Sequence, residues 1–130
     1  MARMNWREAN RARWVGIRLA HEGEQLLRTA TANNATVVLY TVPAEKTLYL
    51  CAATMGFESH DNEWNRIWIA DETDTPVFYL FETWSQNTTT IPHAGQSYWP
   101  PIELPALYTV KIFSATADRV VRGSIFGWVQ

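Results

Sequence analysis

The sequence has little of what catalytic and metal-binding sites are usually built from. Its single cysteine, Cys51, excludes an internal disulfide, and its place in an apolar run predicts a small buried side chain rather than a nucleophile. The histidines His21, His60 and His93 lie far apart, and none has the zinc-site spacing to another histidine or to the cysteine. Neither a Gly-x-Ser-x-Gly motif nor a glycine-rich phosphate loop occurs. We therefore expect no enzymatic activity, no metal and no cofactor.

The acidic residues leave two alternatives open. Asp61 with Glu63, and Asp71 with Glu72 and Asp74, are short acidic stretches that could bind calcium, although acidic residues in turns more often face solvent. Glycoside hydrolysis needs two carboxylates, and no sequence pattern pairs any two of the candidates. Those candidates are Glu58, Glu63, Glu82 and Glu103.

Long hydrophobic runs are also absent. No apolar stretch is long enough to cross a membrane, so no membrane partner is expected. The N-terminus is rich in arginine and has no apolar segment of the kind found in secretory signals. Hydrophobic residues nevertheless make up 47% of the 130 residues, which is enough for the core of one domain.

Charge is distributed unevenly along the chain, although the net charge is only −2. Residues 1–28 hold six arginines against three glutamates, whereas residues 29–130 hold five basic against ten acidic residues. A basic arm on an acidic body indicates that the arm binds an interaction partner. The alternative is that its charges only form the solvent-exposed face of a helix. We therefore divide the chain into a basic arm, residues 1–22, and a domain, residues 23–130.

The arm contains the only segment with helical periodicity, residues 5–21. Asn5 followed by Glu8 has the spacing of a helix cap. Tryptophan and arginine are enriched at the energetic centres of protein interfaces, and the arm carries both. Two further tryptophans lie in loop-like, polar or proline-rich surroundings, which makes them candidates for a contact surface. The predicted partner-binding residues are Arg3, Trp6, Arg7, Arg11, Arg13 and Trp14 in the arm, and Trp64 and Trp99 in the domain.

The rest of the chain has the period-two alternation of strands. We predict eight strands with short connections, over residues 24–32, 35–42, 47–58, 66–70, 76–84, 96–99, 108–115 and 119–129. Asn33 and Asn34 form a strong turn signal, Gly56 is a candidate bulge, and Pro100 and Pro101 are expected to interrupt the chain. The pattern predicts an all-β fold: a jelly roll or two-sheet antiparallel β-sandwich, with a short N-terminal helix or arm.

One phrase occurs twice, about half a chain length apart. Residues 41–50 read TVPAEKTLYL and residues 103–112 read ELPALYTVKI, so each contains an apolar residue, Pro-Ala, a threonine and then alternating apolar residues. Proline fixes φ and suits a turn, and the alternating apolar residues after the threonine are typical of a strand. The repeat therefore predicts two equivalent corners, each joining a strand to a strand in the opposite sheet.

The segments VPAEKTLYL, PPIELPALYTVKI and the terminal GSIFGW resemble the jelly-roll capsid cement (decoration) proteins of tailed bacteriophages, over about residues 35–130. Similar domains often have glycine after Pro-Ala, where this chain has Glu45 and Leu107. If the corner requires a positive φ there, a leucine is an unfavourable substitute.

The resemblance implies a non-enzymatic virion protein, made in the host cytoplasm, that binds the outside of the capsid. It would associate with itself as a homodimer or homotrimer and bridge neighbouring copies of the major capsid protein. The alternative is a receptor- or carbohydrate-binding knob of a phage fibre, using Trp64 and Trp99. Nucleic acid is not the expected partner, because the arginines alternate with glutamates and form no basic block.

Overall fold

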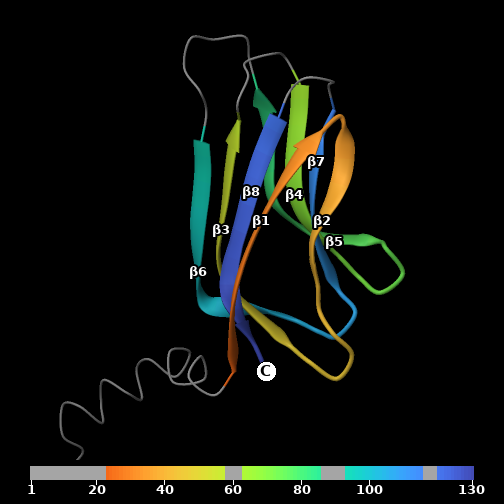
Figure 1. The fold of residues 1–130 in the computed structure, drawn as a ribbon, viewed down its shortest axis with the longest axis vertical. Helices are drawn as coiled ribbons and strands as arrows, with labels where there is room; N and C mark the ends of the chain where they lie inside the picture. Colours follow the sequence, from red (N-terminus) through yellow and green to blue (C-terminus); the bar gives the residue numbers. More distant parts are fainter. Residues whose placement is uncertain (1–22, 58–62, 86–92, 116–119) are drawn as a thin grey trace, which may run out of the picture.

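The computed structural model describes residues 23–57, 63–85, 93–115 and 120–130 (Figure 1). This part of the chain contains eight strands and no helix. The strands are β1 (Glu24–Asn33), β2 (Ala35–Thr41), β3 (Leu48–Phe57), β4 (Glu63–Ala70), β5 (Pro76–Ser85), β6 (His93–Leu104), β7 (Thr109–Ser114) and β8 (Val120–Val129). The predicted all-β class is confirmed, and the helix predicted over residues 5–21 lies outside the described residues.

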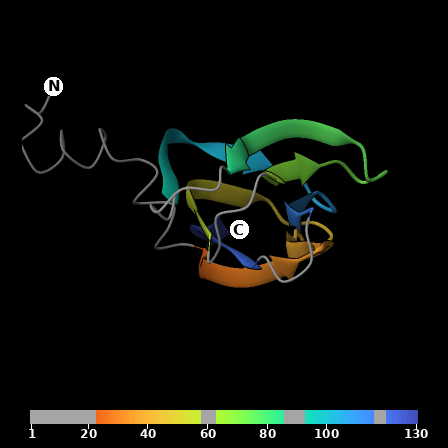
Figure 2. The same ribbon diagram turned by 90° about the horizontal axis from the view of Figure 1, so that it is seen from above.

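The strands form two four-stranded antiparallel sheets. Sheet A has the order β1-β8-β3-β6, and sheet B has the order β2-β7-β4-β5. Figure 2 looks along the sandwich and shows the two sheets as facing layers. Successive strands alternate between the sheets except for β4 and β5, which are neighbours in sheet B. This is the topology of a jelly roll, so the finer of the two predicted folds is the one observed.

The core lies between the inner faces of the two sheets. In β7 the exposure alternates at every residue, with Val110, Ile112 and Ser114 buried. The core also contains Leu48, Leu50, Met55, Ile67, Ile69, Leu104, Val121 and Ile125, all nearly fully buried. Period-two alternation thus places one face of each strand in the core and leaves the other face for solvent or a partner.

Two predicted interruptions of the strands are wrong. Residues 59–65 were expected to form a loop, but β4 already begins at Glu63. Residues 100 and 101 were expected to break the chain, yet β6 runs through both prolines to Leu104. Proline lacks a backbone donor and is tolerated at a sheet edge, and β6 is one of the two edge strands of sheet A.

Two turn signals require partial correction. Asn34 has a φ of 49°, so the turn after Asn33 is confirmed, but the strands on either side of it belong to different sheets. The bulge in β3 lies between Leu50 and Ala52 rather than at Gly56. A hairpin-like turn signal therefore fixes where the chain reverses but not which strand pairs with which.

The two Pro-Ala corners are equivalent turns, as the repeated phrase predicts. The amide of Lys46 donates to the carbonyl of Pro43 at 3.2 Å, and the amide of Tyr108 donates to the carbonyl of Pro105 at 3.3 Å. The third residue of each turn has a positive φ, 63° at Glu45 and 69° at Leu107, which is typical of a type II turn. These are the positions where similar domains often have glycine. Because φ is positive, the backbone conformation at both positions is unfavourable for a residue with a side chain.

Replacing either of these residues by glycine is expected to stabilise the domain. A left-handed conformation costs an L-residue about 1–2 kcal/mol, and the entropy of the unfolded glycine offsets about half of the gain. We expect Glu45→Gly and Leu107→Gly each to raise the free energy of unfolding by about 0.5–1 kcal/mol, measured by denaturant titration. Ala44→Gly, at the neighbouring position without a positive φ, should lower it. Destabilisation by Glu45→Gly would contradict this account of the corners.

Candidate functional site

The six predicted contact residues of the arm lie outside the described residues. They are Arg3, Trp6, Arg7, Arg11, Arg13 and Trp14. The structure does show where the arm is attached. Glu24, at the start of β1, lies opposite Val129, and Gln130 exchanges two backbone hydrogen bonds with Thr47 beside the first Pro-Ala corner. The arm therefore joins the domain at the end of the sandwich that carries the C-terminus.

The two remaining predicted contact residues, Trp64 and Trp99, are not brought together. Trp64 lies in β4 of sheet B and Trp99 in β6 of sheet A, so the loop predicted around Trp64 is wrong, whereas Trp99 lies in a strand, as residues 96–99 were predicted to do. The side chain of Trp99 is 54% exposed and remains a candidate for contact. The side chain of Trp64 lies outside the described part of the structure.

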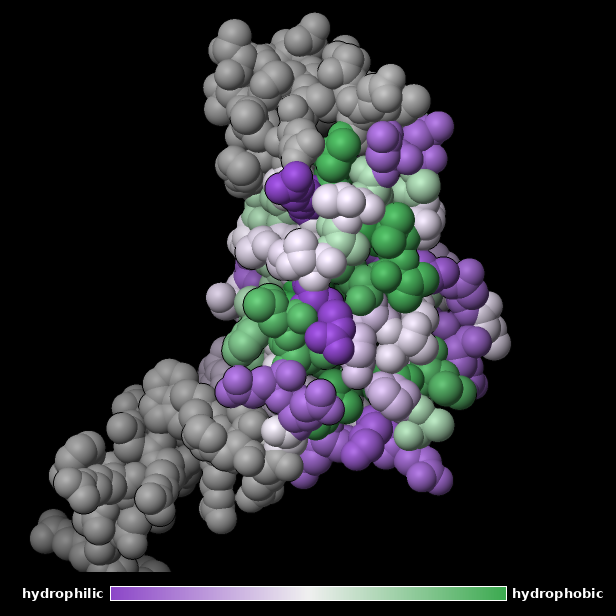
Figure 3. All heavy atoms as spheres, in the orientation of Figure 1, coloured by the Kyte–Doolittle hydropathy of each residue, from purple (hydrophilic) through white to green (hydrophobic). Residues whose placement is uncertain are grey.

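The outer face of sheet A contains an exposed apolar pair. Leu27 in β1 lies directly opposite Phe126 in β8, and their side chains are 64% and 46% exposed. The neighbouring positions across the sheet hold small residues, which are Ala52, Ser97, Thr29, Ser124, Thr54 and Gly95. We call this surface the sheet A face. Figure 3 shows hydrophobic patches between hydrophilic residues in the middle of the molecule and a mainly hydrophilic lower end.

The outer face of sheet B carries aromatic side chains instead. Opposite residues in antiparallel strands share a face, so the pairings place Phe113, Arg66 and Glu82 in one row and Lys111, Trp68 and Tyr79 in the next. A shallow depression of about 250 Å³ opens here and is lined by Thr36, Arg66, Trp68, Pro76, Tyr79 and Phe113. We call it the sheet B depression.

Two side chains of opposite charge lie together at the sheet B depression and offset each other's charge. Arg66 Nε lies 3.5 Å from Glu82 Oε2, which is an ion-pair distance, and this buried nitrogen makes no hydrogen bond. The Arg66 guanidinium carbon also lies 6.0 Å from the centre of the Tyr79 ring, within reach of a cation–π interaction. Both charged side chains are about one third exposed, at 36% and 39%. The depression therefore combines aromatic surface with one donor group and one acceptor group.

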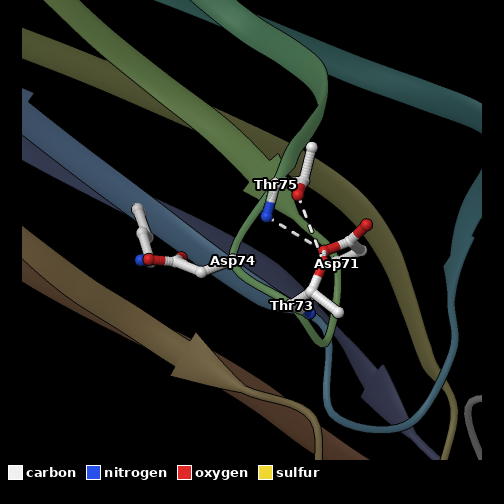
Figure 4. Close-up of polar contacts among 5 residues, drawn as sticks. Asp71, Thr73, Asp74 and Thr75 are labelled. Carbon is white, nitrogen blue, oxygen red and sulfur yellow. Dashed lines mark hydrogen bonds and ion pairs between the residues drawn. The ribbon is translucent and has the colours of Figure 1, made fainter.

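The acidic turn between β4 and β5 uses one carboxylate to hold its own shape and another to pair with β7 (Figure 4). Asp71 Oδ1 accepts hydrogen bonds from the amide of Thr75 at 2.9 Å and from the amide and hydroxyl of Thr73 at 2.9 and 2.8 Å. The pKa of Asp71 is lowered, mainly by the hydrogen bond from the Thr75 amide and next by the one from the Thr73 hydroxyl. The stability that these bonds contribute is therefore lost only when the pH falls far enough to protonate the carboxylate. Asp74 pairs with Lys111 of β7. No group of three potential metal ligands occurs within the described ranges.

Cys51 does not lie in the core as predicted. It is half-buried at the bulge of β3, where the alternation between inner and outer faces is broken. Burial raises the pKa of its thiol, which lowers the fraction of reactive thiolate at neutral pH. The thiol is therefore poorly suited to act as a nucleophile.

Comparisons with known proteins add little to this picture. No protein-family model matches the sequence, and no curated protein matches it. Among solved structures, the Drosophila NLP core is similar, with a TM-score of 0.46 and 16% identity over 81% of this chain and 98% of that one. That structure was described for pentamer formation and histone binding. Across the residues that the structure describes, no helix has the length and apolarity needed to cross a membrane.

The sequence did not reveal the sheet B depression as a unit. Trp68 stands among apolar residues in the sequence, a pattern typical of burial, but it is only half-buried and faces outward. No sequence pattern links the other lining residues Arg66, Tyr79 and Phe113, since they lie in three different strands. Alternation within each strand could place them on outer faces, but only the register between strands brings them together.

Proposed function

We propose that this chain is a non-enzymatic virion protein of a tailed phage, a cement protein that binds the outside of the capsid. It acts as a homodimer or homotrimer and bridges neighbouring major capsid protein subunits. Support comes from the sequence resemblance and from the jelly-roll fold. The basic arm provides a second point of attachment beside the domain.

The observation that carries this proposal is the sheet A face. Leu27 and Phe126 are large, apolar, adjacent and exposed, and the side chains around them are small, so another protein surface can approach the pair closely. Burying such a pair contributes a few kcal/mol at most, about 1.5–3 for each side chain fully buried. One contact of this size is weak, but a shell repeats it many times, and linked contacts add through effective concentration. A protein that binds only the assembled shell also stabilises that shell by mass action.

Co-sedimentation with purified shells that lack the cement protein tests this function. We expect the full chain to sediment with the shells and the double variant Leu27→Ser/Phe126→Ser to lose at least about tenfold in affinity. Val38→Ser is the matched control, because Val38 is about as exposed as Phe126, at 48% against 46%, but lies on the outer face of sheet B. The same assay on a chain that lacks residues 1–18 measures how much of the affinity for the shell comes from the arm.

Two results would contradict the proposal. One is undiminished shell binding by the double variant together with the deletion. The other is the absence of this chain from purified virions of the phage that encodes it, as determined by mass spectrometry.

A further inference from the structure

The sheet B depression has the composition of a sugar-binding surface. Three aromatic rings from three neighbouring strands, Phe113, Trp68 and Tyr79, line one shallow hollow. Tyr79 is 45% exposed, so its ring is open to a ligand from solvent. The flat apolar side of a pyranose ring consists of C–H groups, which pack against the electron-rich faces of aromatic rings.

The ion pair at the rim decides what kind of ligand fits. A lone arginine beside aromatic rings would favour an anion, but Glu82 lies 3.5 Å from Arg66 and offsets its charge. Together they present N–H donors next to a carboxylate acceptor. Adjacent hydroxyl groups of a neutral sugar can both donate and accept, so they match this pair, whereas a carboxylate or phosphate would meet the repulsion of Glu82.

The size of the depression sets the size of the ligand. The volume of about 250 Å³ corresponds to roughly eight water molecules, which is space for one sugar ring rather than a long chain.

We propose that the sheet B depression binds one ring of a neutral hexose-type glycan, stacked on Trp68 and Tyr79 and hydrogen-bonded to Arg66 and Glu82. This site differs from the one that the sequence suggested for sugars, which was built on Trp64 and Trp99. It also does not depend on the proposed function, because it lies on the opposite sheet from the sheet A face.

Nuclear magnetic resonance titration of the isotope-labelled full chain tests the site. The neutral probes are lactose, cellotetraose and chitotetraose, and sialyllactose is the acidic counterpart of lactose. We expect at least one neutral probe to bind with a Kd of about 0.1–1 mM, with shifts centred on Arg66, Trp68, Tyr79 and Phe113. Tyr79→Ala, which lies on an exposed edge strand, should weaken this binding at least about tenfold.

Two further variants make the result specific. Glu82→Gln keeps the shape of the side chain but leaves Arg66 uncompensated, so it should favour sialyllactose over lactose relative to the unmodified chain. Trp99→Ala removes an exposed tryptophan from the other sheet and should leave sugar binding unchanged. The proposal is overturned if no neutral probe binds at about 10 mM, if sialyllactose binds the unmodified chain better than lactose, or if Tyr79→Ala has no effect. None of these outcomes involves the shell, so the two proposals fail separately.

Discussion

Gly127→Ala should leave the chain largely unfolded. A Cβ atom at this position would lie 2.1 Å from the carbonyl oxygen of Tyr49 and 3.2 Å from Cα of Leu50. Both atoms belong to the backbone of β3, which is hydrogen-bonded to β8 on one side and β6 on the other, so they cannot move aside as a side chain would. We expect the free energy of unfolding to fall by at least about 4 kcal/mol, a large part of the total stability of a domain.

Gly95→Ala is the matched control for this substitution. Gly95 is also in sheet A, but its added Cβ would meet only the methyl group of Thr54, at an ordinary contact distance of 3.7 Å. Alanine there should change stability by no more than about 1 kcal/mol, measured by denaturant titration. Equal effects of the two substitutions would show that glycine is not required for the close approach of β8 to β3.

The fold was predictable from the sequence because its main signals are local. Alternation in segments such as residues 109–114 sets the strand and its buried face without reference to any other segment. The Pro-Ala repeat likewise marks two of the connections that carry the chain between the sheets. Predictions failed where a neighbouring strand decides the outcome. Pro100 and Pro101 are tolerated because β6 is an edge strand, and that position is a property of the whole sheet.

The candidate site was less predictable for the same physical reason. Tyr79 lies opposite Trp68 only because bulges in β5 shift its register against β4, between Ile67 and Trp68 and again between Ile69 and Ala70. A shift of one residue would turn these rings to the other face. The sequence contains the residues of the sheet B depression, but the bulges that align them leave no clear mark in it.

The two sheets divide the proposed roles between opposite sides of one rigid block. The sheet A face has an apolar pair among small residues, which suits a protein partner. The sheet B depression has aromatic rings and a compensated ion pair, which suits a small polar ligand. Because the faces point in opposite directions, a chain docked through sheet A would keep sheet B open to solvent.

That rigidity depends on how the sheets interlock, and Ile112→Ala should weaken it strongly. Ile112 in β7 is fully buried and points across the core to Gly123 in β8, where its Cδ1 would lie 2.7 Å from an added Cβ. Since Gly123 has no side chain that could relax into the space, truncation leaves a cavity. We expect a loss of about 3–4 kcal/mol in the free energy of unfolding, against about 1 kcal/mol for Ile112→Val.

A second substitution tests whether this packing is the cause. Gly123→Ala alone should destabilise the domain by about 1–3 kcal/mol, because its Cβ meets the ends of Ile112 and Ile67 at 2.7 and 2.8 Å. In the Ile112→Ala background the same methyl group enters the vacated space, so its cost should shrink or change sign. A double-mutant cycle would then give a coupling energy of about 1 kcal/mol or more. Simple additivity of the two effects would mean that Ile112 and Gly123 do not share one packing site, and that the sheets are held together by contacts elsewhere in the core.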